Sequence, residues 1–555
     1  MSNEPENSLA TATLPIAEVP PLPETPRNSL LRNNIIVASG TAMSRLTGLI
    51  RVYAFARFVG QAAIADAYNA ANGSPNAIYE LLLGGVLSAT LIPIFTKQAE
   101  DKDDEATSAV FTVAMIVVTT LTLASIIAAP AIFHLFSVNV TGDADVYRAA
   151  GTALARVFLI QIFFYGFIAL ATALLNAHRR FFAAAWAPVL SNVVIIATLA
   201  MVPHVVDHPP TVEDILTDRA LRWTLALGAT GGIAIMAIAL LPAIRMAHIR
   251  LRWNPNFRHP AIKLLTRLSG WTLGYVVFNQ IAAITIVNLA DPGTGHPDAY
   301  AKAYILFVLP HGLLAMSIAT TFEPEMARNV KRRLRQGMID VTSLGIRLVA
   351  LFTFPAGLLM FTLRRPIVGF ALQHGNFTAE NALDTSRALG GFAIGLAGFS
   401  VYLFTLRAFY AHNDARTPFV INVFENIINI VLAFVLHDRF GVLGLGLAFA
   451  IAYLISAVFA MQVLGYKLTG FPVRAVLTAL ARMGVAALLM AEAAWLVGHV
   501  GANTGWQAFA RVVVASIAGL AVYVGALVVM RAPEIDQLKS WFTRRSAGNS
   551  AASAT

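Results

Sequence analysis

Cysteine is absent from this 555-residue chain, and charged residues are scarce. Without cysteine the chain can form no disulfide, use no thiol nucleophile and hold no metal through thiolates. Charged side chains make up only 13% of the residues, against about 25% in an average soluble domain. A deficit of this size excludes an ordinary water-soluble globular protein.

The motifs of several common chemistries are also missing. The chain has no G-x-x-x-x-G-K-[ST] loop for ATP phosphates, no H-E-x-x-H or other cluster of metal ligands, and no nucleophile elbow of the hydrolase type. We therefore predict no enzyme activity, no cofactor and no metal site. Any energy for transport is expected from the membrane potential or from a gradient of a monovalent cation.

What the sequence does have is a series of long apolar stretches. Hydrophobic residues make up 57% of the chain, and the mean hydropathy is +0.67. Stretches of about 20 apolar residues are long enough to cross a bilayer as helices. The predicted spans are 34–58, 64–95, 108–136, 147–177, 181–203, 220–244, 263–290, 299–326, 339–363, 382–411, 417–437, 442–466, 475–500 and 507–530. This predicts an all-α polytopic membrane protein with about fourteen transmembrane helices.

The net charge is +10, and most of the basic residues lie in every second loop between these spans. If the N-terminus is cytoplasmic, most basic residues fall in loops on the inner side, as the positive-inside rule requires. They are His178, Arg179, Arg180, Arg245, Arg250, Arg252, Arg258, Lys263, Arg328, Lys331, Arg332, Arg333, Arg335, Arg416, Lys467 and Arg474, whereas Arg364, Arg365 and Arg439 are exceptions. This pattern explains the basic balance without nucleic acid. It predicts cytoplasmic N- and C-terminal tails, residues 1–32 and 532–555, in the bacterial plasma membrane.

Two arginines lie inside the first predicted span. A charge at bilayer depth costs a few kcal/mol by insertion scales, so it needs a partner or a water-filled cavity. Arg45 and Arg51 are six residues apart, which places them about 9 Å apart along a helix. We interpret both as lining one wide cavity.

The second predicted span carries a polar stripe at helical spacing. The stripe contains Asp66, Asn69, Asn72, Asn76 and Glu80, with Tyr79 beside it. Residues 73–75 read Gly-Ser-Pro, and an internal proline removes a backbone donor, so the helix is expected to kink or unwind there. A polar stripe on a broken helix is typical of a transporter cavity. Hydrogen bonds between neighbouring helices would explain the asparagines equally well.

Two further ionisable residues lie in predicted spans and are hard to explain as chain ends. Glu425 has Asn422 and Asn429 one turn to either side, and oxygen ligands at this spacing could hold a cation or a proton. Hydrogen bonding between helices is the alternative for these three residues. Lys302, in the eighth span, is the other.

Short segments throughout the chain resemble the MurJ (MviN) family of the MOP exporter superfamily. They are SRLTGLIR at 44–51, ADAY at 65–68, SPN at 74–76, GGVLS at 84–88, IPIF at 92–95, LNAHRRF at 175–181, WAP at 186–188, LPHGL at 309–313, QHGNFT at 373–378 and RAFYAHNDARTP at 407–418. The resemblance implies fourteen helices in two pseudo-symmetric lobes around a cationic cavity. It implies a flippase that moves lipid II, the undecaprenyl-pyrophosphate-linked peptidoglycan precursor, between the leaflets, with the cell-wall synthesis machinery as a partner.

The resemblance also places functional residues. Two arginines and an aspartate of the family's cavity fall on Arg45, Arg51 and Asp66, whereas two further family arginines fall on Tyr79 and Ile305. In these departures the sequence resembles the actinobacterial branch of the family. We predict that Lys302, one turn before Ile305, supplies a missing charge for the pyrophosphate, because a cation in a low-dielectric cavity binds phosphate oxygens.

The expected organisation follows from the same resemblance. Residues 33–245 would form the N-lobe, 246–466 the central part and C-lobe, and 467–531 two last helices that form a groove for the lipid tail. Residues 369–386 are amphipathic and are interpreted as a re-entrant or interfacial element, with a plain loop as the alternative. Other functions remain open at this point: another MOP carrier, such as a lipid-linked oligosaccharide flippase or a multidrug antiporter, or a non-transporting scaffold.

Overall fold

The computed structural model describes residues 27–81, 87–101, 103–260, 262 and 270–534, and these residues form helices and connecting loops without a β-strand. The first ten labelled helices are α1 (Arg27–Phe58), α2 (Ala63–Tyr79), α3 (Leu87–Asp101), α4 (Asp104–Ile127), α5 (Ala129–Leu135), α6 (Ala144–Phe158), α7 (Gln161–Ala177), α8 (Phe181–Val205), α9 (Asp214–Thr217) and α10 (Arg219–Met246). Those that follow are α12 (Gly270–Leu289), α13 (His296–Pro310), the π-helical turn η2 (His311–Ala315), α14 (Met316–Lys331), α15 (Arg335–Thr362), α16 (Arg364–Leu372), α17 (Ala379–Ile394), α18 (Leu396–Ala411), α19 (Arg416–Phe440), α20 (Val442–Lys467), α21 (Val473–Gly498) and α22 (Gly505–Val529).

The expectation of an all-α membrane protein is confirmed, and the count of spans is close to the prediction. Within the described residues, eleven helical segments are long and apolar enough to cross a membrane, and α17 with α18, bent by 49°, makes a twelfth if the pair is one span. The two remaining predicted spans correspond to α2 with α3, between which residues 82–86 lie outside the described part, and to α12, before which residues 263–269 also lie outside it. The described part of neither span is by itself a long, continuous apolar helix, which is why the two counts differ.

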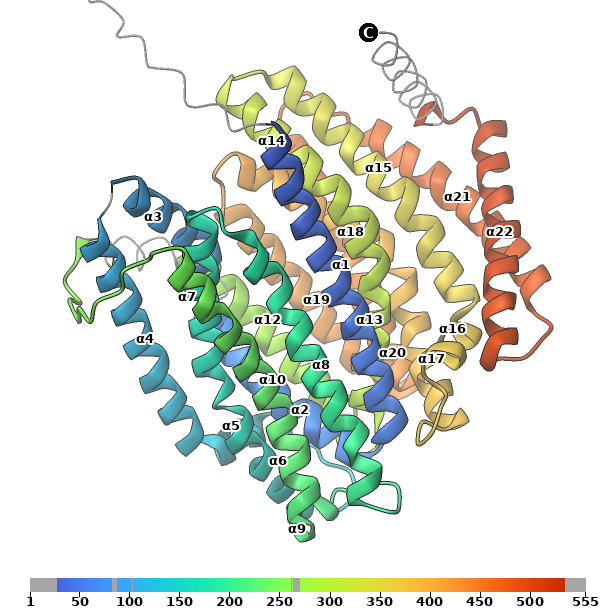
Figure 1. The fold of residues 1–555 in the computed structure, drawn as a ribbon. Helices are drawn as coiled ribbons and strands as arrows, with labels where there is room; N and C mark the ends of the chain where they lie inside the picture. The colour runs from blue at the N-terminus through green and yellow to red at the C-terminus, as the bar shows by residue number, and fades with distance from the viewer. Residues whose placement is uncertain (1–26, 82–86, 102, 261, 263–269, 535–555) are drawn as a thin grey trace, which may run out of the picture.

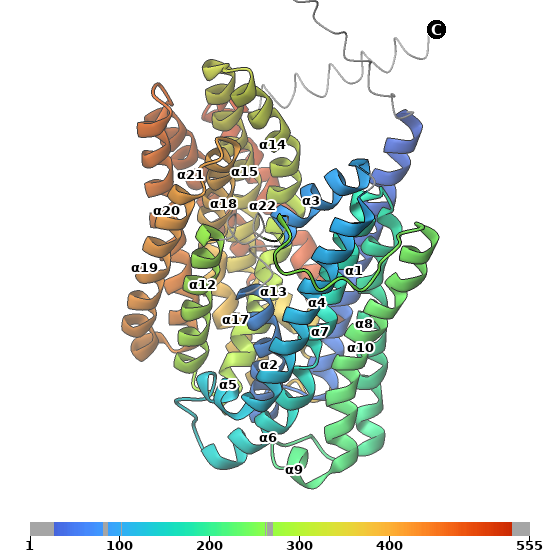
Figure 2. The same ribbon diagram turned by 90° about the vertical axis from the view of Figure 1, so that its left-hand side faces the viewer.

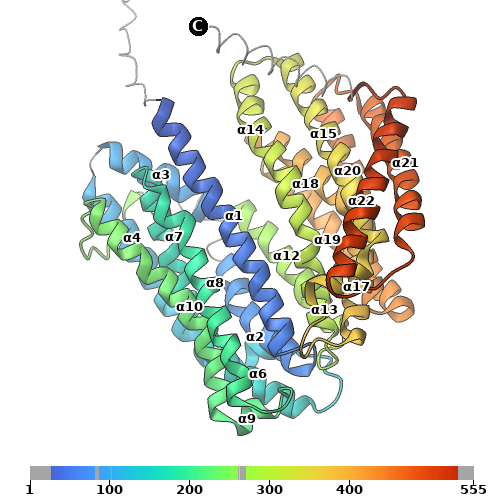
Figure 3. The same ribbon diagram turned by 45° about the vertical axis from the view of Figure 1, so that its right-hand side comes forward.

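The helices form two groups that stand side by side (Figures 1 and 3). Helices α1–α10 pack mainly on one another and are called the N-terminal lobe here, whereas α12–α22 form the C-terminal lobe. Figure 2 shows α12 beside α19, and these two helices are in contact. Helices α21 and α22 pair with each other and cover α15 and α16 at the edge of the C-terminal lobe.

The start of α1 and the end of α22 lie at the same end of the molecule (Figure 1). We call this end the terminal face; the loops at 178–180, 332–334 and 412–415 lie there. We call the opposite end the far face; it holds the loops at 59–62, 290–295 and 373–378. Figure 3 shows the lobes diverging toward the terminal face and converging at the far face.

Helix α2 runs through Pro75 without unwinding, so of the two expected outcomes at residues 73–75, a kink or an unwound turn, the second does not occur. Proline at position 75 cannot donate to the carbonyl of Ala71 four residues earlier. The hydroxyl of Ser74 donates to that carbonyl instead, at 2.8 Å. Since the carbonyl keeps a donor, the helix continues to Tyr79 before it ends.

Residues 369–386 comprise the end of α16, a turn and the start of α17. Thr378 caps α17 by accepting a hydrogen bond from the backbone of Asn381, whose side chain accepts one in return. The backbone N–H of Asn376 donates to the carbonyl of Arg57 at 2.9 Å. The segment is therefore a compact turn that joins the C-terminal lobe to the end of α1.

Candidate functional site

A cavity that is partly open to solvent, with about 660 Å³ of space including that open part, lies between the lobes. Its walls come from α1, α2, α7, α8 and α10 of the N-terminal lobe and from α13 of the C-terminal lobe. Apolar side chains form the walls on α8 and α10. The polar and charged lining residues are Arg51, Tyr68, Asn69, Asn72, Gln161, Tyr165, Asp298 and Lys302.

Arg51 lines this cavity and is half-buried. It lies seven residues before the end of α1, about 10 Å from that end at the rise of an α-helix. Arg45 lies about 9 Å further toward the terminal face and is exposed, with its guanidinium against Gly312 in the π-helical turn. The two arginines thus follow each other along α1; of the two, Arg51 belongs to the lining of this cavity, and Arg45 lies on its terminal-face side.

Lys302 also lines the cavity, although only 3% of its surface is exposed. Its ammonium group forms an ion pair with Asp298, one turn earlier on α13. It lies 3.4 Å from the carbonyl oxygen of Gly60 and 5.2 Å from the ring of Phe55, both in the N-terminal lobe. Lys302 is therefore a cavity cation that already has a carboxylate partner.

Asp66, predicted beside the arginines, lies outside the lining of this cavity and contacts the start of α13. Only 1% of it is exposed, and its carboxylate accepts hydrogen bonds from the backbone N–H groups of Gly293 (3.0 Å), Gly295 (2.7 Å) and Asp298 (3.0 Å). Gly295 precedes α13 with φ of +87°, and glycine has no side chain to cap the helix. Asp66 supplies this N-terminal cap from the other lobe.

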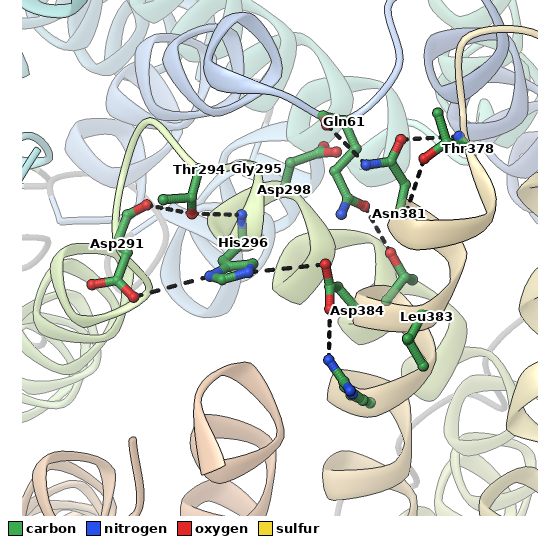
Figure 4. Close-up of polar contacts among 12 residues, drawn as sticks. Gln61, Asp291, Thr294, Gly295, His296, Asp298, Thr378, Asn381, Leu383 and Asp384 are labelled. Atoms are coloured by element: carbon green, nitrogen blue, oxygen red, sulfur yellow. Dashed lines mark hydrogen bonds and ion pairs between the residues drawn. The ribbon is translucent and has the colours of Figure 1, made fainter. Parts of the chain in front are cut away.

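Further hydrogen bonds join the lobes beside Asp66. The carbonyl of Gln61 accepts from the side chain of Asn381 at 3.1 Å, and the side-chain oxygen of Gln61 accepts from Thr385 at 2.8 Å (Figure 4). The side chain of Asn376 donates to the carbonyl of Phe58 at 2.9 Å. We call the contacts of Gln61, Asp66, Asn376 and Asp298 across the lobe boundary the far-face latch. It closes the cavity on that side.

The remaining polar residues of α2 divide between the cavity and packing. Asn69 donates to Asp298 at 2.7 Å, and Asn72 accepts from Gln161 at 3.3 Å; both asparagines line the cavity. Asn76, Tyr79 and Glu80 lie outside the lining. Asn76 donates to the backbone of α2, Tyr79 packs on Tyr165, and Glu80 accepts from Gln280 at 2.8 Å. The predicted stripe is therefore part cavity and part helix contact.

Glu425 lies in the C-terminal lobe, away from this cavity. Glu425, Asn422 and Asn429 are at most 6% exposed. Asn422 and Asn426 both donate to the side-chain oxygen of Asn279 at 3.1 Å. Both carboxylate oxygens of Glu425 and the side-chain oxygens of Asn422 and Asn429 have no hydrogen-bond donor among the described residues. Four buried acceptors without donors form a site suited to a positive species.

Sequence reasoning did not identify Asp298, Gln161 or Tyr165. Asp298 and Lys302 are spaced i, i+4, which is the spacing of an ion pair on one helix face, and this signal was present in the sequence. Gln161 begins α7 in an apolar context, and Tyr165 follows one turn later. These two residues line the cavity because α7 packs against α2 in the folded chain, and the local sequence around them does not predict this contact.

A model of the lipid II flippase MurJ family matches residues 55–515. The chain belongs to the MurJ family. Among curated relatives, a probable lipid II flippase MurJ of Rhizobium meliloti is 25% identical over 473 residues, covering 84% of this chain and 86% of the relative. The lipid II flippase MurJ of Burkholderia cenocepacia is 26% identical over 430 residues, covering 76% and 81%.

Solved structures agree on the fold. A structure of lipid II flippase MurJ in an inward closed conformation superposes with a TM-score of 0.73 at 21% identity, covering 90% of this chain and all of that one. An inward-facing multidrug resistance MATE transporter of the MOP superfamily gives 0.58 at 14% identity, covering 76% and 98%. This multi-pass membrane protein thus has the fold that MurJ shares with MATE transporters. Within it, Tyr79 and Ile305 occupy positions where the sequence resemblance expects arginine.

Proposed function

We propose that this chain flips lipid II from the cytoplasmic to the outer leaflet of the bacterial plasma membrane by alternating access. The observation that carries the proposal is the cavity between the lobes, where Arg51 and Lys302 lie at membrane depth beside a latch on one face. Cations that line a cavity suit a diphosphate, because charge-assisted hydrogen bonds to phosphate oxygens are strong. A transporter is what membership in the family implies, and no enzyme activity is proposed.

The terminal face is assigned to the cytoplasm, because it carries the loops that are rich in arginine and lysine. The cavity then opens inward while the far-face latch closes the outer side. Arg45 lies on the cytoplasmic side of the cavity and would contact the headgroup as it approaches Arg51. The polyprenyl tail would remain in the bilayer along α21 and α22, because an apolar chain gains nothing from a polar cavity.

The proposal is tested by substituting one cavity arginine. Arg51→Ala should abolish growth of a strain depleted of its own flippase, and lipid II should accumulate in the inner leaflet. Arg328→Ala is the matched control: this side chain is 65% exposed, and its ion pair among the described residues is with Glu325 on its own helix. Growth supported equally by both variants at equal membrane levels would refute a role of the cavity cation.

We further propose that transport is coupled to a monovalent cation or a proton at Glu425. The support is chemical: a buried carboxylate with two amide oxygens near it offers oxygen ligands to a small cation. Glu425→Gln should remove the response of flipping to an imposed cation gradient or membrane potential in proteoliposomes. Glu492→Gln, an exposed carboxylate on α21, should keep the response. Coupling that survives in Glu425→Gln would exclude this site.

A further inference from the structure

The ion pair between Lys302 and Asp298 is part of the cavity wall and also part of the contact between the two lobes. Both side chains line the cavity, so a ligand there can reach them. Yet they are only 3% and 1% exposed, and the pair is buried where the lobes meet. A buried ion pair holds its charges only while each has its partner, since losing one leaves an uncompensated charge.

Asp298 connects the pair to the far-face latch. Its backbone N–H donates to Asp66, and its second carboxylate oxygen accepts from Asn69 at 2.7 Å. Both Asp66 and Asn69 come from α2 of the opposite lobe. The position of Asp298 is therefore fixed by the latch, and a change at its side chain acts directly on contacts between the lobes.

Lys302 reaches the same boundary from its other side. Its ammonium group lies 3.4 Å from the carbonyl oxygen of Gly60, at the end of α1. The rings of Phe55 and Phe377 lie 5.2 and 5.5 Å from it, within the range of a cation–π contact. Phe377 belongs to the turn that docks on α1. Moving this ammonium group toward the cavity would release its contacts with the end of α1 and with the turn at residues 373–378, which meet at the far face.

A diphosphate in the cavity would compete with Asp298 for Lys302. It offers more negative charge and more acceptor oxygens than one carboxylate, and charge-assisted hydrogen bonds of this kind are strong. Arg51 lines the same cavity and has no carboxylate among its described hydrogen bonds and ion pairs, so it can hold the other end of the anion. The ligand thus has the means to draw Lys302 away from its partner.

We propose that Asp298 is the resident counter-ion of Lys302, and that the lipid diphosphate exchanges with it and thereby loosens the far-face latch. This inference rests on the proposed function, because it needs a diphosphate in the cavity. It assigns to Asp298 a positioning role that couples headgroup binding to opening on the outer side. The empty protein stays latched because Lys302 neutralises Asp298 beneath Asp66 and Asn69.

Binding measurements separate this role from a purely structural ion pair. Purified full-length protein is titrated with undecaprenyl pyrophosphate as the probe. Asp298→Asn frees Lys302 and should bind the probe about tenfold more tightly, whereas Lys302→Met leaves a repelling carboxylate and should bind about tenfold more weakly. A structural pair predicts that both variants change affinity in the same direction. Asp384→Asn, a far-face carboxylate outside the cavity lining, should bind like the native protein.

The coupling to the latch needs a second readout. Since the chain has no cysteine, Ala56→Cys places a single thiol on α1, at a residue that is fully buried against the C-terminal lobe. The probe should raise the rate of its labelling by a hydrophilic maleimide severalfold. The same probe should leave the rate unchanged when Lys302→Met is added.

These measurements distinguish a failure of the proposed flippase function from a failure of the counter-ion exchange at Asp298. If the native protein does not bind undecaprenyl pyrophosphate, the proposed function fails and the exchange fails with it. If the native protein binds but Asp298→Asn and Lys302→Met shift affinity in the same direction, only the exchange is overturned. Labelling at position 56 that ignores the probe would also overturn the link to the latch.

Discussion

Replacing Asp66 by asparagine is the most direct test of the far-face latch. The carboxylate has two acceptor oxygens: one receives the N–H groups of Gly293 and Gly295, and the other receives the N–H of Asp298. Asparagine keeps only one acceptor and presents an NH₂ group in place of the other. Whichever way the amide is oriented, at least one backbone N–H at the start of α13 loses its partner.

The size of the effect follows from these contacts. A buried N–H without an acceptor costs about 1–3 kcal/mol, and hydrogen bonds to a charged acceptor exceed neutral ones by about 1 kcal/mol each. One lost bond and two weakened ones give about 3–5 kcal/mol in favour of the open latch. The lower value corresponds to a shift of about 100-fold in the ratio of closed to open far face.

The assay uses the buried thiol of Ala56→Cys, whose labelling rate reports how often the far face opens. Asp66→Asn should raise the rate toward that 100-fold limit, whereas the overall helix content should not change. Asp214→Asn is the control, because the contacts that the structure gives the Asp214 carboxylate are with Thr211 and His208 of its own lobe. A labelling rate within twofold of the parent in Asp66→Asn would refute the idea that this carboxylate holds the lobes together.

Two further predictions concern the glycine of the docking turn and an ion pair on the terminal face. Gly375 has φ of +62°, and a Cβ there would lie 2.4 Å from the carbonyl oxygen of Arg57. Gly375→Ala should therefore open the far face and raise the labelling rate of the thiol at position 56. A labelling rate equal to that of the parent would contradict this contact. Partial burial would raise the pKa of Asp414, but hydrogen bonds from Lys467 and Thr417 outweigh it and hold the pKa at about 2. Because this pKa is depressed, the contribution of Asp414 to stability is complete above about pH 4 and is lost as the pH falls toward 2. The thermal unfolding temperatures of the native protein and of Lys467→Met should therefore converge over this range. A difference in unfolding temperature that stays constant with pH would argue against the ion pair.

The resemblance of short motifs carried the family assignment, and the family model supports it. Hydropathy placed the spans, because a helix in a bilayer must be long and apolar whatever it packs against. The same rule drew attention to Arg51 and Lys302, since charges at that depth are costly. It could not separate a cavity residue from a latch residue: Asp66 and Asn69 share one helix and one polar stripe, yet only Asn69 lines the cavity.

The sequence by itself thus determined the membrane class, most of the helices and the charged residues that need an explanation. Only the tertiary structure decided what those residues contact. The partners of Asp66 are backbone N–H groups more than 220 residues away, and a backbone donor leaves no trace in residue identity. Which backbone N–H groups can reach Asp66 depends on how the chain turns before α13 and on how the two lobes pack together. A local sequence pattern predicts neither of these.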